Sequence, residues 1–330
     1  MKRRRNMRLA ATAMVLLAAT GLLSGCSGNW SDWGSWLVLD PKGPIGGAQR
    51  DLIVISTLLC AVVIVPVLIL AAIIVWRYRE RKNSTAAYQP TWEHNTRLEV
   101  IWWSIPIIII AALATITFHY TYKIEPSKPL EAAGKKAITI QVVSLDWKWL
   151  FLYPEQGIAS VNYVRFPEDT PVRFELTSDA PMNSFWIPQL GGQIYTMSGM
   201  AMKLYLQADE PGVYFGSGAN FSGREFASMR FDAEATPQGD FDKWVQQVKG
   251  GSKALTTDDY AKLAEQGIGH RQQFSALPDG LFDSIVNKYA SSHHHQAAEA
   301  KADKGDKAKS DAAKKDTMPG MDHSQHSMTK

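Results

Sequence analysis

Cysteine is nearly absent from this chain of 330 residues, which contains only two. Both Cys26 and Cys60 lie in the N-terminal fifth of the chain. A disulfide-rich scaffold is therefore excluded, as is any site that needs two thiolates in a later domain. The net charge is also small, at +3, and the basic residues of the folded part do not cluster, so no nucleic-acid partner is expected.

The apolar residues are distributed unevenly. A hydrophobic fraction of 45% and a charged fraction of 20% are ordinary values for a soluble protein. Yet two long runs carry no charge, whereas residues 291–330 are almost entirely polar. A single soluble globule is therefore excluded.

Residues 1–25 have the three parts of an export signal. A basic stretch, MKRRRNMR, precedes the apolar core LAATAMVLLAATGLL and a small-residue site. Leu23-Ser24-Gly25-Cys26 resembles a bacterial lipobox, which implies cleavage before Cys26 and attachment of a diacylglyceryl lipid to it. The alternative is an uncleaved membrane anchor, which the short, alanine-rich core disfavours.

Residues 52–76 and 100–122 are predicted to be transmembrane helices that form a hairpin. Their uncharged runs, Leu52–Val75 and Val100–Phe118, are about 36 and 28 Å long at roughly 1.5 Å per helical residue. Both lengths are close to the ~30 Å of a hydrocarbon core.

The charge of the flanking segments predicts the orientation of the hairpin. Residues 77–99 carry five basic side chains, whereas residues 26–51 carry only Lys42 and Arg50. The positive-inside rule places residues 77–99 in the cytoplasm and both ends of the mature chain outside. With the lipobox, this indicates a lipid-anchored protein of a bacterial cytoplasmic membrane.

After a linker at 123–136, residues 137–233 are predicted to form an all-β domain. So many short strands in about 97 residues predict an antiparallel sandwich or a small Greek-key barrel. The runs expected to be strands are AITIQVVS, VNYVRF, PVRFELTS, QIYTM, MKLYLQA, GVYFG and SMRFDA.

Two further regions follow the β domain. Residues 239–290 show helical spacing of apolar residues from Phe241 onward and are predicted to form short amphipathic helices. Residues 291–330 are predicted to be disordered, because they bury too little apolar surface to offset the entropy of ordering. His323 and His326, with nearby methionines, are candidates for weak copper binding; the alternative is a solvated tail.

Three segments together resemble subunit II of the haem–copper respiratory oxidases: SLDWKWLFLYPEQGIASVNYV, TSDAPMNSFWIPQLGGQIYTMSGM and EPGVYFGSGANFSGREFASMRF. The resemblance extends from the lipobox to about residue 290, and it implies a cupredoxin-like fold for the β domain. In the cytochrome c-oxidising branch of this family, that domain holds a dinuclear copper centre. Two thiolates, two imidazoles and a thioether supply the soft ligands.

Most of these copper ligands are missing at the matching positions. Asn183 and Phe226 stand where the two histidines are expected, and Gly218 and Ser222 stand where the two cysteines are expected. Only Met229 keeps its identity, and one thioether alone cannot hold copper. No metal ligand is therefore predicted in the folded part of this chain, and the resemblance implies that it holds no catalytic residue.

Asn220 stands where the copper-binding branch has a carbonyl-donating glutamate. The whole pattern resembles the quinol-oxidising branch, the bo-type and ba-type ubiquinol oxidases, in which electrons enter directly from quinol. The resemblance implies a membrane complex with subunits I, III and IV that oxidises ubiquinol, reduces dioxygen to water and pumps protons. The haems and the remaining copper would belong to subunit I.

The resemblance also implies a role for Glu99, which directly precedes the second apolar run. Glu99 matches an acidic residue proposed as the cytoplasmic mouth of a proton channel shared with subunit I. The predicted orientation puts it on the required side of the membrane. The alternative is an ordinary carboxylate at the membrane interface.

Trp147 and Trp149 match a tryptophan-rich region that faces subunit I in the family. Without a copper donor, the two residues are predicted to dock the domain on subunit I. They alternate with Phe151 and Tyr153, which predicts that all four share one face of a strand. Packing in the core of a sandwich is the alternative.

Two other functions remain as alternatives. A copper-bearing subunit II of a cytochrome c oxidase is contradicted at four side-chain ligand positions. An exported lipoprotein that binds copper through its tail does not account for two membrane spans.

Overall fold

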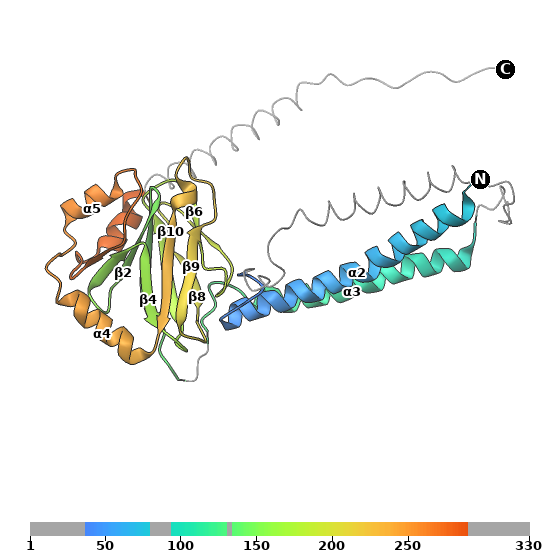
Figure 1. Ribbon diagram of the computed structural model, residues 1–330, viewed down its shortest axis with the longest axis horizontal. Helices are drawn as coiled ribbons and strands as arrows, with labels where there is room; N and C mark the ends of the chain where they lie inside the picture. The colour runs from blue at the N-terminus through green and yellow to red at the C-terminus, as the bar shows by residue number, and fades with distance from the viewer. Residues whose placement is uncertain (1–36, 80–93, 131–133, 290–330) are drawn as a thin grey trace, which may run out of the picture.

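The computed structural model describes residues 37–79, 94–130 and 134–289. The predicted signal with Cys26, most of the predicted cytoplasmic loop, and the tail with His323 and His326 lie outside the described residues. The described parts form a helical hairpin joined to a β-sandwich, which carries further helices on its far side (Figure 1).

Helices α2 (Pro44–Tyr78) and α3 (Thr96–Lys123) lie side by side and form the hairpin (Figure 1). Both are long and apolar enough to cross a membrane, and no residue in their most apolar stretches is buried within the chain. The start of α3 is fixed locally, because the side-chain oxygen of Asn95 accepts a hydrogen bond from the Leu98 N–H at 3.2 Å.

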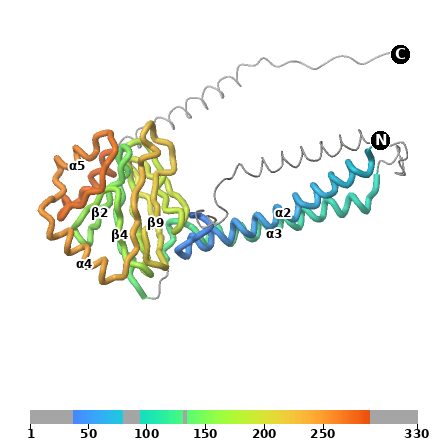
Figure 2. Tube along the Cα trace, in the orientation of Figure 1, coloured from blue at the N-terminus to red at the C-terminus, as the bar shows by residue number. Residues whose placement is uncertain are grey.

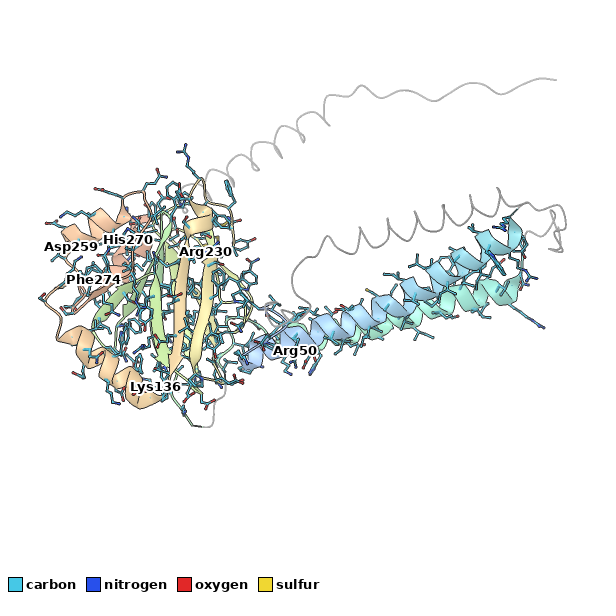
Figure 3. The ribbon with its side chains drawn as sticks, in the orientation of Figure 1. Arg50, Lys136, Arg230, Asp259, His270 and Phe274 are labelled. Atoms are coloured by element: carbon cyan, nitrogen blue, oxygen red, sulfur yellow. The ribbon has the colours of Figure 1, made fainter. Side chains whose placement is uncertain are left out.

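Helix α2 begins before the predicted span because its first turn is bonded to the sandwich. The Lys42 N–H donates to the Gln189 carbonyl at 2.8 Å, and the Gly46 N–H donates to the Leu190 carbonyl at 3.0 Å. A Cβ atom at Gly46 would lie only 2.8 Å from the Gln189 carbonyl oxygen, so this close approach requires glycine. Arg50 lies just beyond this junction (Figure 3).

The sandwich contains two sheets, with strand orders β11-β3-β2-β1-β5-β8 and β4-β10-β9-β6-β7 (Figure 2). All pairs are antiparallel except β1 with β5 and β4 with β10, which are parallel. The predicted antiparallel arrangement is wrong at these two pairs, because the chain visits the second sheet at β4 before β5 returns beside β1. The strands are β1 (Ile138–Leu145), β2 (Lys148–Tyr153), β3 (Ile158–Val161), β4 (Tyr163–Pro167), β5 (Val172–Ser178), β6 (Asn183–Trp186), β7 (Ile194–Thr196), β8 (Met202–Leu206), β9 (Gly212–Gly218), β10 (Arg230–Thr236) and β11 (Gln272–Phe274).

All seven predicted runs overlap observed strands, but VNYVRF is divided between β3 and β4. The division occurs at Asn162, whose φ of 53° lies in the left-handed region that asparagine tolerates. The Asn162 side-chain oxygen accepts from the Trp149 N–H at 2.8 Å, and its amide donates to the Gly269 carbonyl at 2.7 Å. The seven runs omit β2, β6 and β11.

Strand β2 is buried on both faces, which explains why it has no polar–apolar alternation. Trp149, Phe151 and Tyr153 belong to the core between the two sheets. Leu150 and Leu152 belong to a second core on the opposite face of the same sheet. The first sheet is therefore the middle layer of three.

Residues 255–289 of the C-terminal extension (238–289) supply the third layer, whereas residues 241–248 pack into the core between the two sheets. Phe282 is buried against the outer face of the first sheet, in the same core as Phe274 of β11. Asp259 and Phe274 lie on the side of the sandwich away from the hairpin (Figure 3). Thr256 and Asp259 form a capping box at the start of α5. The elements of the extension are α4 (Gln238–Lys249), α5 (Thr257–Ala264), β11 and the helical residues 281–289.

Candidate functional site

Four of the predicted copper-ligand positions meet inside the sandwich. The side-chain amide of Asn183 donates to Ser222 Oγ at 3.1 Å and to Met229 Sδ at 2.9 Å. Its side-chain oxygen accepts from the Ser184 N–H at 2.7 Å. Gly218, at the end of β9, lies against the same side chain. We call Asn183, Gly218, Ser222 and Met229 the Asn183 cluster.

The Asn183 cluster is closely packed and largely closed to solvent. Asn183 and Met229 are each 1% exposed. A Cβ atom at Gly218 would lie 2.8 Å from Asn183 Oδ1, which is closer than a normal contact. A larger residue at position 218, including a cysteine, therefore does not fit beside the Asn183 side chain in this arrangement.

The other two predicted positions border the cluster. The Asn220 side chain donates to the Met182 carbonyl at 3.1 Å, and its backbone N–H lies 3.5 Å from Asn183 Oδ1. Phe226, in a 3-10 turn, places its ring centroid 5.8 Å from that of Phe221. The structure thus brings all six positions to one end of the sandwich, with four of them in direct contact.

Trp147 and Trp149 do not share a face. Trp147 precedes β2 with a φ of 63°, and its Nε1–H donates to the Ser222 carbonyl at 3.0 Å. Trp149 is completely buried, with its ring centroid 5.4 Å from that of Phe185 and 5.8 Å from that of Phe231. The prediction that Trp149 docks on a partner is therefore wrong, because its indole has no exposed surface. Trp147 is half-buried, and its docking role stays a prediction.

The Asn183 cluster does not fit a copper centre. Asn183, Ser222 and Met229 offer an amide, a hydroxyl and a thioether, and the thioether sulfur already accepts a hydrogen bond. A copper centre of this type needs thiolates and imidazoles. Within the described residues, no three His, Cys, Asp or Glu side chains gather into a metal-binding group. The cluster is instead neutral and satisfied by its own hydrogen bonds.

Glu99 lies in the first turn of α3, at the end of the hairpin far from the sandwich (Figure 1). Its Oε1 accepts from the Asn95 N–H at 3.3 Å and lies 3.3 Å from His94 Nδ1. Together with the bond from Leu98 to Asn95, these contacts form a reciprocal cap of the helix. Glu99 is thus held at the edge of the apolar run, partly exposed.

Asp179 is a buried carboxylate that no pattern in the sequence indicates. Its side chain is 1% exposed and accepts hydrogen bonds from Tyr260 at 2.5 Å, from Tyr289 at 2.7 Å and from Lys288 at 2.7 Å. We call these four residues the Asp179 cluster. The three donors come from the C-terminal extension, at least 81 residues along the chain, so no local pattern could have revealed them.

The Asp179 cluster holds its carboxylate ionised. Burial by itself raises the pKa of Asp179, but the hydrogen bonds from Lys288, Tyr260 and Tyr289 outweigh burial and keep this pKa below its ordinary value. The hydrogen bond to Asp179 in turn raises the pKa of Lys288. The cluster therefore joins a negative and a positive group.

Comparisons with known proteins agree along most of the chain. Residues 48–120 match the transmembrane domain of cytochrome c oxidase subunit II, residues 154–236 match its periplasmic domain, and residues 249–293 match the COX aromatic rich motif.

Curated proteins from several bacteria are also similar to the chain. Over 270 residues it is 49% identical to the cytochrome bo(3) ubiquinol oxidase subunit 2 of Pseudomonas putida, covering 81% of this chain and 82% of that protein. Over 274 residues it is 43% identical to the ubiquinol oxidase subunit 2 of Acetobacter aceti, covering 83% and 86%. Over 240 residues it is 48% identical to the quinol oxidase subunit 2 of Bacillus cereus, covering 72% and 82%.

Proposed function

The chain belongs to the quinol oxidase subunit II family, and on this premise we propose that it is a subunit without a redox centre of its own. The complex that contains it oxidises ubiquinol, reduces dioxygen to water and pumps protons. The names of relatives at 43–49% identity support ubiquinol as the donor. In this proposal the haems and copper belong to subunit I, and subunits III and IV complete the complex.

The Asn183 cluster is the observation that carries this proposal. A relay from a soluble cytochrome to the membrane needs a redox centre in the exported domain. The amide of Asn183, the hydroxyl of Ser222 and the thioether of Met229 do not supply ligands for one. Ubiquinol is dissolved in the membrane and reaches subunit I without such a relay. The sandwich is then kept as a scaffold for assembly.

Purified complex tests this proposal directly. We expect oxygen consumption with ubiquinol and none with reduced cytochrome c, and we expect Met229→Leu to leave the ubiquinol rate unchanged. Elemental analysis should find the copper of subunit I alone. Oxidation of cytochrome c, together with copper that Met229→Leu removes, would instead establish a copper relay in this chain.

Glu99 is proposed to admit protons to a channel shared with subunit I. Its position at the edge of the apolar run of α3, bonded to the Asn95 N–H and beside His94, supports this role. Glu99→Ala is expected to slow turnover while haem content stays normal. Asp51→Asn is the control, because Asp51 is a carboxylate near the other end of the hairpin. Unchanged turnover in Glu99→Ala would leave Glu99 as a helix cap only.

Trp147 is proposed to contact subunit I. Its indole is half-buried beside the loop of Ser222, where Phe221 is 76% exposed. Trp147→Ala is expected to reduce the amount of subunit I that co-purifies with this chain. Trp147→Phe keeps an aromatic ring but loses the hydrogen bond to the Ser222 carbonyl. Normal assembly of that variant would show that the ring, and not the hydrogen bond, makes the contact with subunit I. Normal assembly of Trp147→Ala would dismiss the contact.

The membrane attachment is proposed to include a lipid on Cys26, with both mature ends outside the bacterial cytoplasmic membrane. The lipobox and the charge of residues 77–99 support this topology. Mass spectrometry of the mature N-terminus tests it, with a lipid-modified Cys26 as the expected first residue. An intact Met1 would show an uncleaved anchor.

A further inference from the structure

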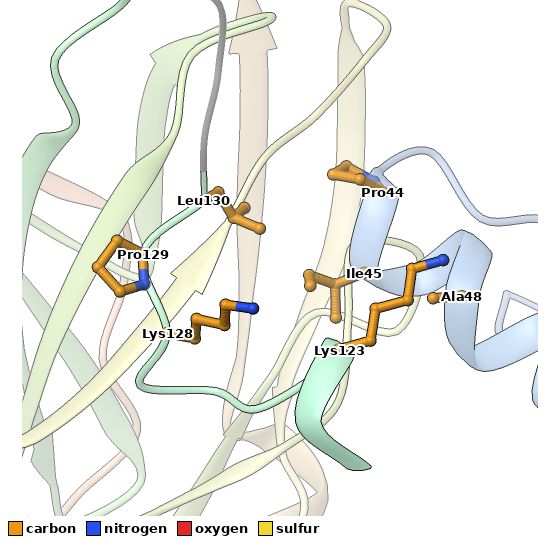
Figure 4. Close-up of a pocket in the computed structure, with 7 residues that line it drawn as sticks. All are labelled: Pro44, Ile45, Ala48, Lys123, Lys128, Pro129 and Leu130. Atoms are coloured by element: carbon orange, nitrogen blue, oxygen red, sulfur yellow. The ribbon is translucent and has the colours of Figure 1, made fainter. Parts of the chain in front are cut away.

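A pocket of about 410 Å³ lies where the hairpin meets the sandwich (Figure 4). One wall comes from the first turns of α2, and the other comes from the end of α3 and the segment that follows it. The lining residues are Pro44, Ile45, Ala48, Lys123, Lys128, Pro129 and Leu130.

Both walls of the pocket are fixed to the sandwich. The Gly46 N–H in α2 donates to the Leu190 carbonyl at 3.0 Å. On the other side, the Pro126 carbonyl accepts from the Tyr205 N–H of β8 at 2.9 Å. The pocket is therefore formed before any ligand enters, which lowers the entropic cost of binding.

The lining combines apolar groups with two ammonium groups. Lys123 Nζ lies 5.5 Å from the centroid of the Tyr120 ring. Within the described ranges, neither Lys123 nor Lys128 forms an ion pair with a carboxylate, whereas Lys42 nearby is paired with Glu210 at 3.0 Å. The positive charge of the pocket is thus available to an anion that also has an apolar part.

The pocket lies at the outer edge of the lipid headgroup layer. At about 1.5 Å per residue, Ile45 lies ~10 Å outside Leu52, where the apolar run of α2 begins. Lys123 lies ~8 Å outside Phe118, where the apolar run of α3 ends. A bilayer adds about 5–8 Å of headgroup on each side of its hydrocarbon core. Lysine side chains extend far enough to meet phosphate groups in this layer.

We propose that this pocket binds the headgroup of an anionic phospholipid in the leaflet beside the sandwich. Lys123 and Lys128 contact the phosphate, and Ile45, Pro129 and Leu130 pack against the carbon atoms of the headgroup on the outer side of the phosphate. A free phosphate ion would leave the apolar lining unused. A zwitterionic lipid would bring a positive group of its own toward the two lysines.

Lipid retained by the purified oxidase complex tests the proposal. After identical detergent washes, quantitative mass spectrometry should find phosphatidylglycerol on the wild-type complex that Lys123→Gln/Lys128→Gln has lost. Lys135→Gln/Lys136→Gln is the matched control, because it removes the same charge outside the pocket. Haem content shows that each complex has assembled. Equal retention in the wild type and in Lys123→Gln/Lys128→Gln would overturn the proposal.

A second variant, Ala48→Phe, tests the effect of the shape of the pocket on lipid binding separately from the effect of its charge. Ala48 is 5% exposed on the pocket wall, so Ala48→Phe should fill the pocket and release the lipid without changing any charge. Stripped wild-type complex should regain lipid from phosphatidylglycerol vesicles but not from phosphatidylcholine vesicles. Equal uptake of both lipids, or displacement by inorganic phosphate, would overturn the lipid assignment. These readouts do not depend on the electron donor, so they stand apart from the proposed function.

Discussion

Two polar clusters whose first residues, Asp179 and Asn183, are four apart in the sequence differ in charge and in what they connect. The Asp179 cluster is ionised, and its donors bring the C-terminal extension to the sandwich. The Asn183 cluster is neutral, and its bonds join the start of β6 to the segment between β9 and β10 within the sandwich. A buried charge here connects the C-terminal extension to the sandwich, whereas a neutral network joins the positions that were predicted to match copper ligands.

This difference predicts different costs of disruption. Removing one partner of a buried charged network costs about 3–5 kcal/mol. Removing one neutral hydrogen bond costs about 1 kcal/mol. Variants of the two clusters should therefore differ in how much stability they lose and in which part of the molecule loses it.

The largest effect is expected from Asp179→Ala. It leaves the Tyr260 and Tyr289 hydroxyls and the Lys288 ammonium without their shared acceptor. Amides of α5 should exchange with deuterium about 100-fold faster, which corresponds to roughly 3 kcal/mol of local stability. Exchange in β9 serves as the internal control. Equal acceleration in both elements would mean that the extension is not held separately.

Gly218→Ala is expected to have the next largest effect. The new Cβ would lie 2.8 Å from Asn183 Oδ1 and would displace that side chain. Crowding of this kind costs about 1–3 kcal/mol. Gly212→Ala in the same strand is the matched control, because its nearest neighbour would be 3.7 Å away. Amide exchange in β6 measures both variants, and equal behaviour would show that the Asn183 cluster tolerates a side chain.

A smaller effect is expected from acid, and of the two clusters only the Asp179 cluster should respond. The folded-state pKa of Asp179 lies below its ordinary value of about 3.9. The stability that its charge contributes is therefore complete well above pH 4 and is lost as the pH falls through that value toward the folded-state pKa. The protection of α5 in the wild type relative to Asp179→Asn should shrink over this range. A constant ratio would show that the charge contributes nothing.

Met229→Leu should have the smallest effect. It keeps the volume of a buried side chain and removes only the sulfur that accepts from Asn183. The expected cost is below about 1.5 kcal/mol, measured as amide exchange of β10. A loss of stability as large as that in Gly218→Ala would mean that the hydrogen bond from Asn183 to the thioether sulfur, rather than packing, holds the cluster together.

The long, uniform patterns of the sequence were the most predictable. The uncharged runs of α2 and α3 indicated the hairpin, and the β-branched runs overlapped eight of the eleven strands. Strand β2 is absent from those runs because both of its faces are apolar, with Trp149 in one core and Leu150 in the other; only the alternation of its aromatic residues indicated a strand. The complete burial of Trp149 also contradicts its predicted docking role. The alternation of aromatic residues in the sequence does not show whether the face that they occupy is exposed.

Length, periodicity and residue type are local properties, and they were enough to indicate two membrane-length helices, a β domain and the lack of cysteine for a copper centre. Only the tertiary structure showed that Asn183, Ser222 and Met229 bond to one another, that Asp179 meets Tyr260, and that Lys123 and Lys128 share a pocket with Ile45. Such contacts join residues far apart in the chain. Their positions depend on how the sheets and helices pack, which no local pattern encodes.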